Sequence, residues 1–366
     1  MTALDKIAFV LDGAAFSSLD HPLLNRFRFG YPRDGEFHRL ENCLISALVA
    51  GRLESAETTR REKDPEARQS RDLRETLEGA RGVFIAGSNS GAEVNDERLK
   101  EVLLNMPQGA RCFVHGAIGT TMESARQLEK LASSRRVTLL AGTPLGVTWR
   151  LPPVEIPKRA RLKDALIVVQ GKAPAAEFDG LEGLMPLIER RRGGEKGIRS
   201  VRFLEGDALW RAGEAGQWSW PLLASALSRS DSPQGDSVRD GRTQDLAGLG
   251  LVQKLAREPR GWVMEHRDGL RSAILVLDGV IADYNFAVLT SDGGIISAQV
   301  YRPPAPADHQ FTRLAEVIED FFRSGMRPWP VERSILIAGL LEVFRNPASR
   351  SGQLIPTPGL GLTYSA

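Results

Sequence analysis

Among the residues of this 366-residue chain that could do chemistry, His115 has the clearest placement. It follows the apolar run Arg111–Val114 and precedes Gly116, as expected for a side chain at the end of a buried strand. An imidazole there could act as a general acid or base, because its ordinary pKa lies near neutral pH. A hydrogen-bonded structural histidine at a turn is the alternative interpretation.

Two polar, glycine-containing segments each follow another predicted strand. Ligands of open α/β sheets bind at the carboxyl ends of the strands, and glycine lets backbone N–H groups approach a phosphate. We therefore interpret these segments as candidate cofactor-binding segments, with an ordinary turn or a plain loop as the alternative for each. The candidate cofactor-binding residues are Asp12, Gly13, Ala14, Gly87, Ser88 and Asn89.

A third group of charged residues lies between positions 150 and 245, much of it in loop-like sequence. These side chains could bind a hydroxylated or anionic substrate through charge-assisted hydrogen bonds. The alternatives are a buried salt-bridge network that orders a long loop for the residues from Arg229 to Asp245, a solvated helix face for Glu182, and stacking or capping for Arg150. The candidate substrate-binding residues are Arg150, Asp179, Glu182, Arg229, Asp231, Arg242 and Asp245.

Composition narrows the class of protein. The net charge is only +2, from 48 basic and 46 acidic residues, which argues against a dedicated nucleic-acid binder. Cys43 and Cys112 lie in apolar runs without metal-ligand spacing, so we expect reduced, buried thiols and no metal site. No apolar run approaches the ~18 residues that span a membrane, and the first residues lack a signal-peptide pattern. We therefore expect a cytoplasmic protein that binds neither membrane nor nucleic acid.

The first part of the chain, residues 1–148, alternates strands with helices. This alternation predicts a Rossmann-like, doubly wound parallel sheet of the nucleotide-binding type. Pro22 is expected to break a helix, and residues 51–69 are expected to form a loop or an exposed helix. The expected strands are Ile7–Leu11, Asn42–Val49, Gly82–Ala86, Arg111–Val114 and Val137–Leu140, with helices at Ser70–Leu77, Asn95–Leu104 and Thr121–Ala132.

The second part, residues 149–366, has a different pattern, and the two parts meet in the segment Val137–Pro157. Asp-Gly pairs separate four strand candidates, which predicts a β-meander. We expect an α+β substrate and oligomerisation domain with a mostly antiparallel, open-faced sheet. Its strands are predicted at Ala165–Val169, Gly197–Leu204, Gly261–His266, Ser272–Leu277, Ala282–Thr290 and Gly293–Tyr301, and its helices at Leu181–Arg192, entered through Asp179, Trp220–Leu227, Phe311–Phe322 and Val331–Phe344.

This arrangement, with the segments LLAGTPLGVTWRLP, GLEGLMPLIERRRGGEKGIRSVRFLEGDALW, LSRSDSPQG, DGRTQDL and RPWPVERSILIAGLLE, resembles the Gfo/Idh/MocA oxidoreductases. The chain looks like a divergent branch of that family. The resemblance implies an NAD(P)-dependent oxidoreductase that acts on a sugar-like or polyol substrate. It also implies that NAD or NADP binds at the first domain and a hydroxylated small molecule at the second.

Three departures from the family pattern favour a second interpretation. The glycine-rich turn is replaced by Asp12 to Ser17 with a single glycine, and the Asp12 carboxylate would repel a pyrophosphate. The stretch that corresponds to the family's Glu-Lys-Pro motif, Val114 to Gly116, has no lysine, and no histidine occurs between His115 and His266. The alternative is therefore a catalytically inactive pseudoenzyme that serves as a ligand-binding or scaffolding protein.

Two further expectations concern the cofactor and the assembly. Arg52, just after the second predicted strand, is a weak indication of a 2′-phosphate partner, so the choice between NAD and NADP stays open. A meander would expose one sheet face that needs covering, and an isologous pair of subunits would cover it. We therefore expect a homodimer or a higher homo-oligomer that assembles through the second-domain sheet.

Overall fold

The computed structural model describes residues 4–11, 21–49, 67–69, 72–87, 94–231, 245–303 and 308–366. The chain forms two compact units. Unit 1 comprises residues 1–147 and 303–338, and unit 2 comprises residues 148–302 and 339–366. The sequence predicts one domain boundary, near residue 148, with residues 303–338 in the second domain, whereas in the structure this segment belongs to unit 1.

Unit 1 is built on a parallel sheet with the strand order β5-β4-β1-β6-β7-β8. This is the order of a Rossmann fold, in which the direction of winding reverses between β1 and β6, and the predicted doubly wound sheet is confirmed. The short strand β5 corrects the prediction of a loop or exposed helix at its position. The strands are β1 Lys6–Leu11, β4 Leu44–Val49, β5 Ala67–Gln69, β6 Gly82–Ala86, β7 Arg111–His115 and β8 Thr138–Gly142.

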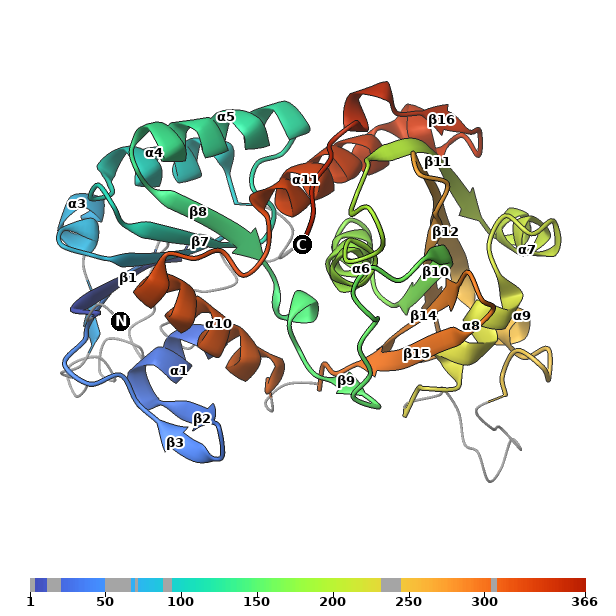
Figure 1. The fold of residues 1–366 in the computed structure, drawn as a ribbon, viewed down its shortest axis with the longest axis horizontal. Helices are drawn as coiled ribbons and strands as arrows, with labels where there is room; N and C mark the ends of the chain where they lie inside the picture. Colours follow the sequence, from blue (N-terminus) through green and yellow to red (C-terminus); the bar gives the residue numbers. More distant parts are fainter. Residues whose placement is uncertain are drawn as a thin grey trace. The chain divides into compact units, whose positions relative to one another are not determined.

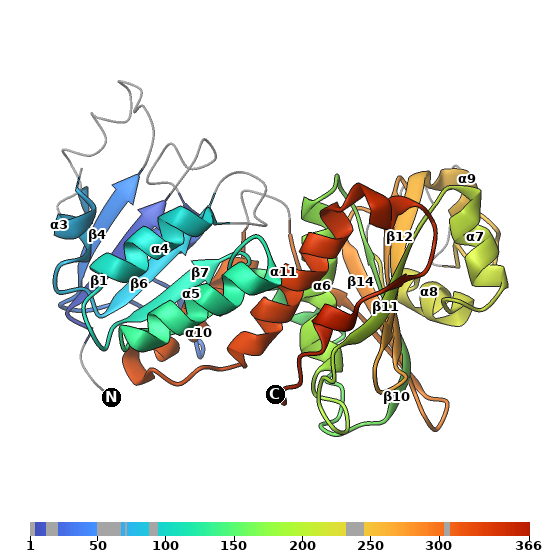
Figure 2. The same ribbon diagram turned by 90° about the horizontal axis from the view of Figure 1, so that it is seen from above.

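Helices cover both faces of this sheet (Figures 1 and 2). Helices α4 and α5 lie on one face, and α1 and α10 lie together on the other. Pro22 does not break a helix but begins one, because a proline at the first helical position loses no hydrogen bond. The helices are α1 Pro22–Phe29, α3 Leu73–Leu77, α4 Asp96–Asn105, α5 Met122–Ser134, η2 Pro144–Gly146 and α10 Gln310–Ser324.

A small hairpin joins α1 to the next strand of the sheet. Its strands β2 Tyr31–Arg33 and β3 Glu36–His38 are connected by Asp34 and Gly35, both at positive φ, as the predicted turn requires. The hairpin is attached to α10, since Tyr31 and His38 both hydrogen-bond to the buried carboxylate of Glu319.

Unit 2 is built on a sheet with the order β16-β11-β12-β13-β10-β14-β15-β9. It is mostly antiparallel, as predicted, but the four-strand meander is wrong. Strand β10 lies between β13 and β14 and pairs with β13 in parallel, so the Asp-Gly pair after β13 makes a turn without making a hairpin. The strands are β9 Arg150–Leu151, β10 Leu162–Val169, β11 Ile198–Glu205, β12 Arg257–His266, β13 Arg271–Asp278, β14 Tyr284–Thr290, β15 Ile295–Val300 and β16 Ile355–Pro356.

Helix α6 packs on one face of this sheet, with Gly180 against Ile274 and Gly183 against Ile167. Helix α6 begins earlier than predicted, so Asp179 lies within it instead of before it. Helices α7 and α8 pack on the opposite face. The helices and 3-10 turns of unit 2 are α6 Ala175–Ile188, α7 Asp207–Glu214, α8 Trp220–Leu227, α9 Val252–Leu255, η3 Pro347–Arg350 and η4 Pro358–Leu360, and α11 Val331–Arg345 belongs to both units.

The helices on the α8 face bear on the expected assembly. Side chains of α7, α8 and α9 form one buried apolar cluster with those of β10, β13 and β14, including Trp210, Trp218, Leu223 and Leu275. The chain itself therefore covers part of the face that was expected to need a second subunit. The homo-oligomer stays a prediction. The need to cover an exposed sheet face no longer supports it at β10, β13 and β14 on the α8 side.

Phe322 on α10 tests whether the returning segment is part of the unit 1 core. Its ring contacts β6 so closely that a Cβ atom added at Gly82 would lie 2.4 Å from it. We expect Phe322→Ala to lower the free energy of unfolding by about 3–5 kcal/mol, the usual cost of truncating a buried phenylalanine. Met326→Ala is the control, because Met326 is 75% exposed. Equal urea midpoints for both variants would contradict the assignment.

Candidate functional site

His115 ends β7 and lies level with Ala86 of β6 and Gly142 of β8, at the carboxyl edge of the parallel sheet. Three rings surround its imidazole. Phe84 lies 6.0 Å away with its ring inclined by 28°, Phe311 lies 5.7 Å away, and the ring of His21 stands at 90° to it at 5.8 Å. The sequence therefore placed His115 at the correct edge, but the neighbours that surround it come from three other segments.

This environment decides the charge of His115. Burial lowers the pKa of His115 to about 4. Part of the surface of this residue is accessible, but three rings enclose the imidazole itself. Burial also lowers the pKa of His21, and proximity to His115 and Arg26 lowers it further. His115 is therefore neutral at pH 7. In this form it can accept a proton, but it lacks the second ring proton that an imidazolium would donate.

The first turn of α1 is the described part of the place where a Rossmann fold commonly holds a pyrophosphate. Here the ring of His21 caps the helix, since its Nδ1 accepts a hydrogen bond of 3.1 Å from the N–H of Leu23. Pro22 has no N–H to offer, and His21, Leu23 and Leu24 are all buried. This first turn does not fit a pyrophosphate, because its donors are absent, already bonded or out of reach.

Most of the other predicted cofactor-binding residues cannot be placed. Gly87 is buried directly after β6, at the carboxyl edge where it was expected. Asp12, Gly13, Ala14, Ser88 and Asn89 lie outside the described residues.

In unit 2, Asp179 on α6 contacts two side chains that the sequence analysis did not select. Its Oδ2 accepts hydrogen bonds from the Tyr284 hydroxyl, at 2.7 Å, and from Nη1 of Arg302, at 2.8 Å. The Arg302 guanidinium also lies over the Tyr284 ring, 4.9 Å from its centroid. Burial and the nearby Asp179 raise the pKa of Tyr284, so its hydroxyl stays protonated.

The predicted substrate residues do not all lie together. Tyr284 and Asn285 are consecutive in β14, and consecutive strand residues point to opposite faces of a sheet. Tyr284 contacts Asp179 on the α6 face, whereas Asn285 hydrogen-bonds to Asp283 on the α8 face. The groups partnered by Asp179 and by Asp231 are therefore separated by the sheet.

On the α8 face, Asp231 takes part in a compact polar cluster centred on the buried carboxylate of Asp283. Gln299 donates to both carboxylates, at 2.8 and 2.7 Å, and Ser230 and the backbone N–H of Asp231 donate to Asp283. Burial and the neighbouring Asp283 raise the pKa of Asp231. Because Asp283 accepts so many internal hydrogen bonds, we interpret this cluster as the network that ties the end of α8 to β14 and β15.

The remaining predicted substrate residues have separate surroundings. Arg229 donates from Nε to Ser297, and Arg150 pairs with Glu155 at 2.8 Å. Asp245 accepts a hydrogen bond from the N–H of Gly248, and Glu182 is buried on α6. Arg242 lies outside the described residues.

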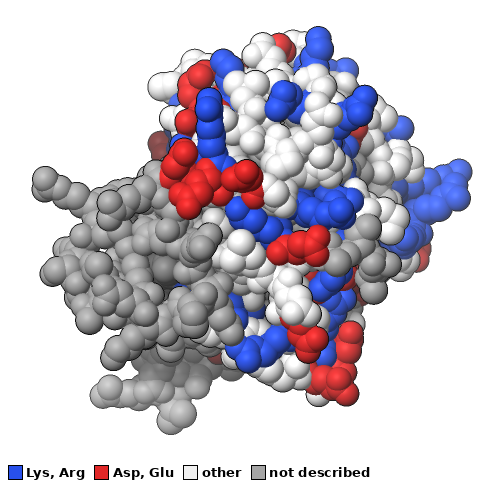
Figure 3. Space-filling model, turned by 90° about the vertical axis from the view of Figure 1, so that its left-hand side faces the viewer, with Lys and Arg blue, Asp and Glu red and all other residues white. Residues whose placement is uncertain are grey.

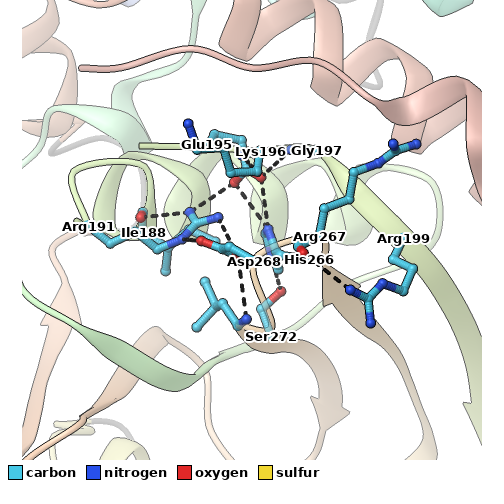
Figure 4. A network of polar contacts seen from close by, with 11 residues as sticks. Ile188, Arg191, Glu195, Lys196, Gly197, Arg199, His266, Arg267, Asp268 and Ser272 are labelled. Carbon is cyan, nitrogen blue, oxygen red and sulfur yellow. Dashed lines mark hydrogen bonds and ion pairs between the residues drawn. The ribbon is translucent and has the colours of Figure 1, made fainter. Parts of the chain in front are cut away.

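A buried charged network that the sequence analysis missed lies beyond the end of α6 (Figure 4). The Glu195 carboxylate accepts from Arg191 at 3.0 Å, from the backbone of Lys196 and Gly197, and contacts His266 at 3.1 Å. Arg191 also pairs with Asp268 at 2.7 Å. With Glu195 and His266 fully enclosed, this network joins the loop after α6 to the β12–β13 turn and has a structural role.

On the described part of the face drawn in Figure 3, basic and acidic side chains are interspersed. Within the described ranges, no three His, Cys, Asp or Glu side chains gather as a metal site. No helix of the described part of the chain is long and apolar enough to cross a membrane.

No protein-family model and no curated protein matches this sequence. Solved structures do match it along nearly its whole length. GenD2 from gentamicin A biosynthesis, in complex with NAD, has a TM-score of 0.59 at 14% identity and covers 98% of this chain and 97% of its own. Myo-inositol dehydrogenase from Lactobacillus casei, in complex with NAD(H) and myo-inositol, has a TM-score of 0.58 at 12% identity, covering 99% and 98%.

A third match is biliverdin reductase from Synechocystis sp. PCC 6803, in complex with biliverdin and NADP+, with a TM-score of 0.52 at 12% identity, covering 96% and 100%. At such identities the likeness establishes the fold. The chain has the two-part fold of these dehydrogenases and reductases, and the resemblance to the Gfo/Idh/MocA oxidoreductases is confirmed at the level of fold.

The ionisation of His115 can be measured directly. We expect its imidazole resonances to change with a midpoint of about 4 and to stay constant between pH 6 and 8. A His whose pKa is lowered by folding contributes stability above its unfolded pKa of ~6.5 and loses it as the pH falls toward 4. NMR titration of the folded protein, with His115→Gln for assignment, measures this. A midpoint near 6.5 would show that the ring enclosure is absent in solution.

The Glu195 network should dominate the acid sensitivity of unit 2. Burial alone would raise the pKa of Glu195, but His266 and Arg191 outweigh it and hold the pKa well below its usual range. We expect Glu195→Gln to cost about 3–5 kcal/mol at pH 7, because it removes the buried negative charge that faces the Arg191 guanidinium. The difference in the free energy of unfolding between the wild type and Glu195→Gln is fully present above the unfolded pKa of ~4.3. It shrinks as the pH falls below that value. Urea unfolding at pH 7 and pH 3 measures both values, and a difference that does not depend on pH would refute the assignment.

Proposed function

We propose that this protein is an NAD(P)-dependent oxidoreductase of Gfo/Idh/MocA type that acts on a sugar-like or polyol substrate. The observation that carries the proposal is the match of both units, over 96–99% of this chain, to three oxidoreductases solved with NAD, NAD(H) or NADP+. A likeness confined to unit 1 would have supported only a nucleotide-binding fold. Retention of the second unit as well supports an activity that uses a cofactor and a second ligand.

The polar groups of unit 2 support a hydroxylated ligand. Asp179 and Arg302 are ion-paired but partly exposed, so each can also hydrogen-bond to a small molecule. Hydrogen bonds to ionised groups are the stronger ones, which suits the recognition of sugar hydroxyls. In unit 1, His115 is the candidate group for proton transfer, and its neutral imidazole would accept a proton from a hydroxyl.

The cofactor would have to bind differently from the usual Rossmann arrangement. When bound, a nicotinamide dinucleotide supplies the hydride chemistry of such enzymes. Since the first turn of α1 does not fit a pyrophosphate, the proposal requires that the phosphates lie away from it.

A second candidate function is favoured by the same first turn. A protein that has lost the pyrophosphate site can keep its ligand site in the other unit and act as a binding or scaffolding protein. The stretch Val114 to Gly116, which corresponds to the family's Glu-Lys-Pro motif but has no lysine, supports this candidate as well. The two candidates agree on unit 2 and differ only in whether unit 1 binds a dinucleotide.

Titration of the purified protein with NADH and NADPH, followed by calorimetry, separates the two candidates. For an oxidoreductase we expect saturable binding of one of them at ~1–100 μM, about −5 to −8 kcal/mol. Myo-inositol and other polyols are then screened for substrate-dependent change in NAD(P)H absorbance. No binding of either dinucleotide at ~5 mM would rule out the oxidoreductase and leave the ligand-binding protein.

A further inference from the structure

We propose that Asp179, Tyr284 and Arg302 form a recognition site that selects an uncharged ligand with adjacent hydroxyl groups over an anionic one. The inference rests on the proposed function only for the idea of a hydroxylated ligand, and it does not depend on a cofactor. It assigns Tyr284 and Arg302 to ligand selection, and it names the charge class of the ligand.

The Asp179–Arg302 ion pair uses only some of its polar atoms within the protein. Nη1 of Arg302 donates to Oδ2 of Asp179 and to the Tyr284 hydroxyl, so this nitrogen is fully used within the protein. Within the described ranges, Nε and Nη2 of Arg302 and Oδ1 of Asp179 make no hydrogen bond. The exposed fractions of the two side chains are 43% and 19%, so these unused atoms can reach a ligand.

The unused atoms of Asp179 and Arg302 have opposite hydrogen-bonding roles. A carboxylate oxygen only accepts hydrogen bonds, and a guanidinium only donates them. Each hydroxyl group can do both. Two adjacent hydroxyls therefore match the pair, one donating to Asp179 and the other accepting from Arg302, and both hydrogen bonds are assisted by charge.

Tyr284 and helix α6 hold the two charged groups in place. Tyr284 lies at the start of β14 and is buried, and its ring lies beneath the Arg302 guanidinium while its hydroxyl bonds to Asp179. Asp179 is fixed on α6, which packs against the sheet through Gly180. Both charged groups are therefore oriented before a ligand arrives, which lowers the entropy cost of binding.

The three side chains together carry no net charge. Asp179 contributes one negative charge and Arg302 one positive charge, and Tyr284 stays neutral because its pKa is raised by burial and by Asp179. An anionic ligand that approached Arg302 would also come close to the Asp179 carboxylate, which is paired with it at 2.8 Å. The two negative charges would repel each other. The pair therefore offers an anion no net attraction, while an uncharged diol uses both groups.

The test compares two sugars that differ at one carbon. D-glucose and D-glucuronate share their ring hydroxyls, but glucuronate carries a carboxylate. Calorimetric titration of the full chain without cofactor should give the wild type a Kd for glucose at least tenfold below that for glucuronate. Asp179→Asn keeps the hydrogen-bond acceptor and removes the negative charge, so the ratio of the two Kd values should fall at least tenfold. Arg302→Gln should weaken the binding of glucose at least fivefold.

Glu265→Gln is the matched control, because Glu265 forms a similar exposed pair with Arg199 elsewhere in unit 2. It should leave both Kd values unchanged. Equal affinities in the wild type, an unchanged ratio in Asp179→Asn, or no saturation by either sugar up to ~50 mM would each overturn the proposal. A change in Asp179→Asn that Glu265→Gln reproduces would also overturn it.

The outcome is independent of the proposed oxidoreductase activity. Sugar selectivity with no dinucleotide binding would support this inference and remove the oxidoreductase. Dinucleotide binding with no sugar selectivity would support the oxidoreductase and remove this inference. Circular dichroism of Asp179→Asn should match the wild type, since asparagine can still accept from Tyr284.

Discussion

Burial of the unit 2 sheet on both faces is the constraint on which its polar chemistry depends. Strand β10 is enclosed between α6 on one side and the cluster of α7, α8 and α9 on the other. Such strands tolerate few polar side chains, because an unpaired polar group in the interior costs several kcal/mol. Polar groups therefore collect where the strands end, and each face holds its own set. Asp179 with Tyr284 lies on one face, and Asp231 with Asp283 lies on the other.

The same constraint explains which parts of unit 2 could be predicted from the sequence. Apolar runs bounded by Asp-Gly pairs located β12, β13, β14 and β15 correctly, since strand length and turn chemistry are local properties. The position of β10 between β13 and β14 is not local, and no turn signal reports it. Without that position, the alternation of Tyr284 and Asn285 could not be turned into two faces. The candidate residues were consequently grouped into one site that the sheet divides.

In unit 1, prediction succeeded for the parallel sheet and failed for its contacts. Regular alternation of strands and helices fixes the class of fold, and Rossmann strand order followed. The segment that returns to this unit carries no local mark of its destination, yet it supplies Phe311 beside His115 and Phe322 beside Gly82. Burial lowers the pKa of His115, and Phe311 is one of the rings that bury it. A sequence can show that a histidine ends a strand, but its proton affinity depends on segments about 200 positions distant.

The first turn of α1 is capped in a way that leaves little for an anion to bind. Capping by His21 satisfies the N–H of Leu23, and Pro22 removes another donor at no cost to the helix. Both features stabilise the helix end, and both remove what an anion would bind. Asp179 and Arg302 belong to unit 2, which has a core of its own. If unit 1 does not bind a dinucleotide, a ligand site built from Asp179 and Arg302 can still be retained in unit 2, because function resides in a site and not in the fold as a whole.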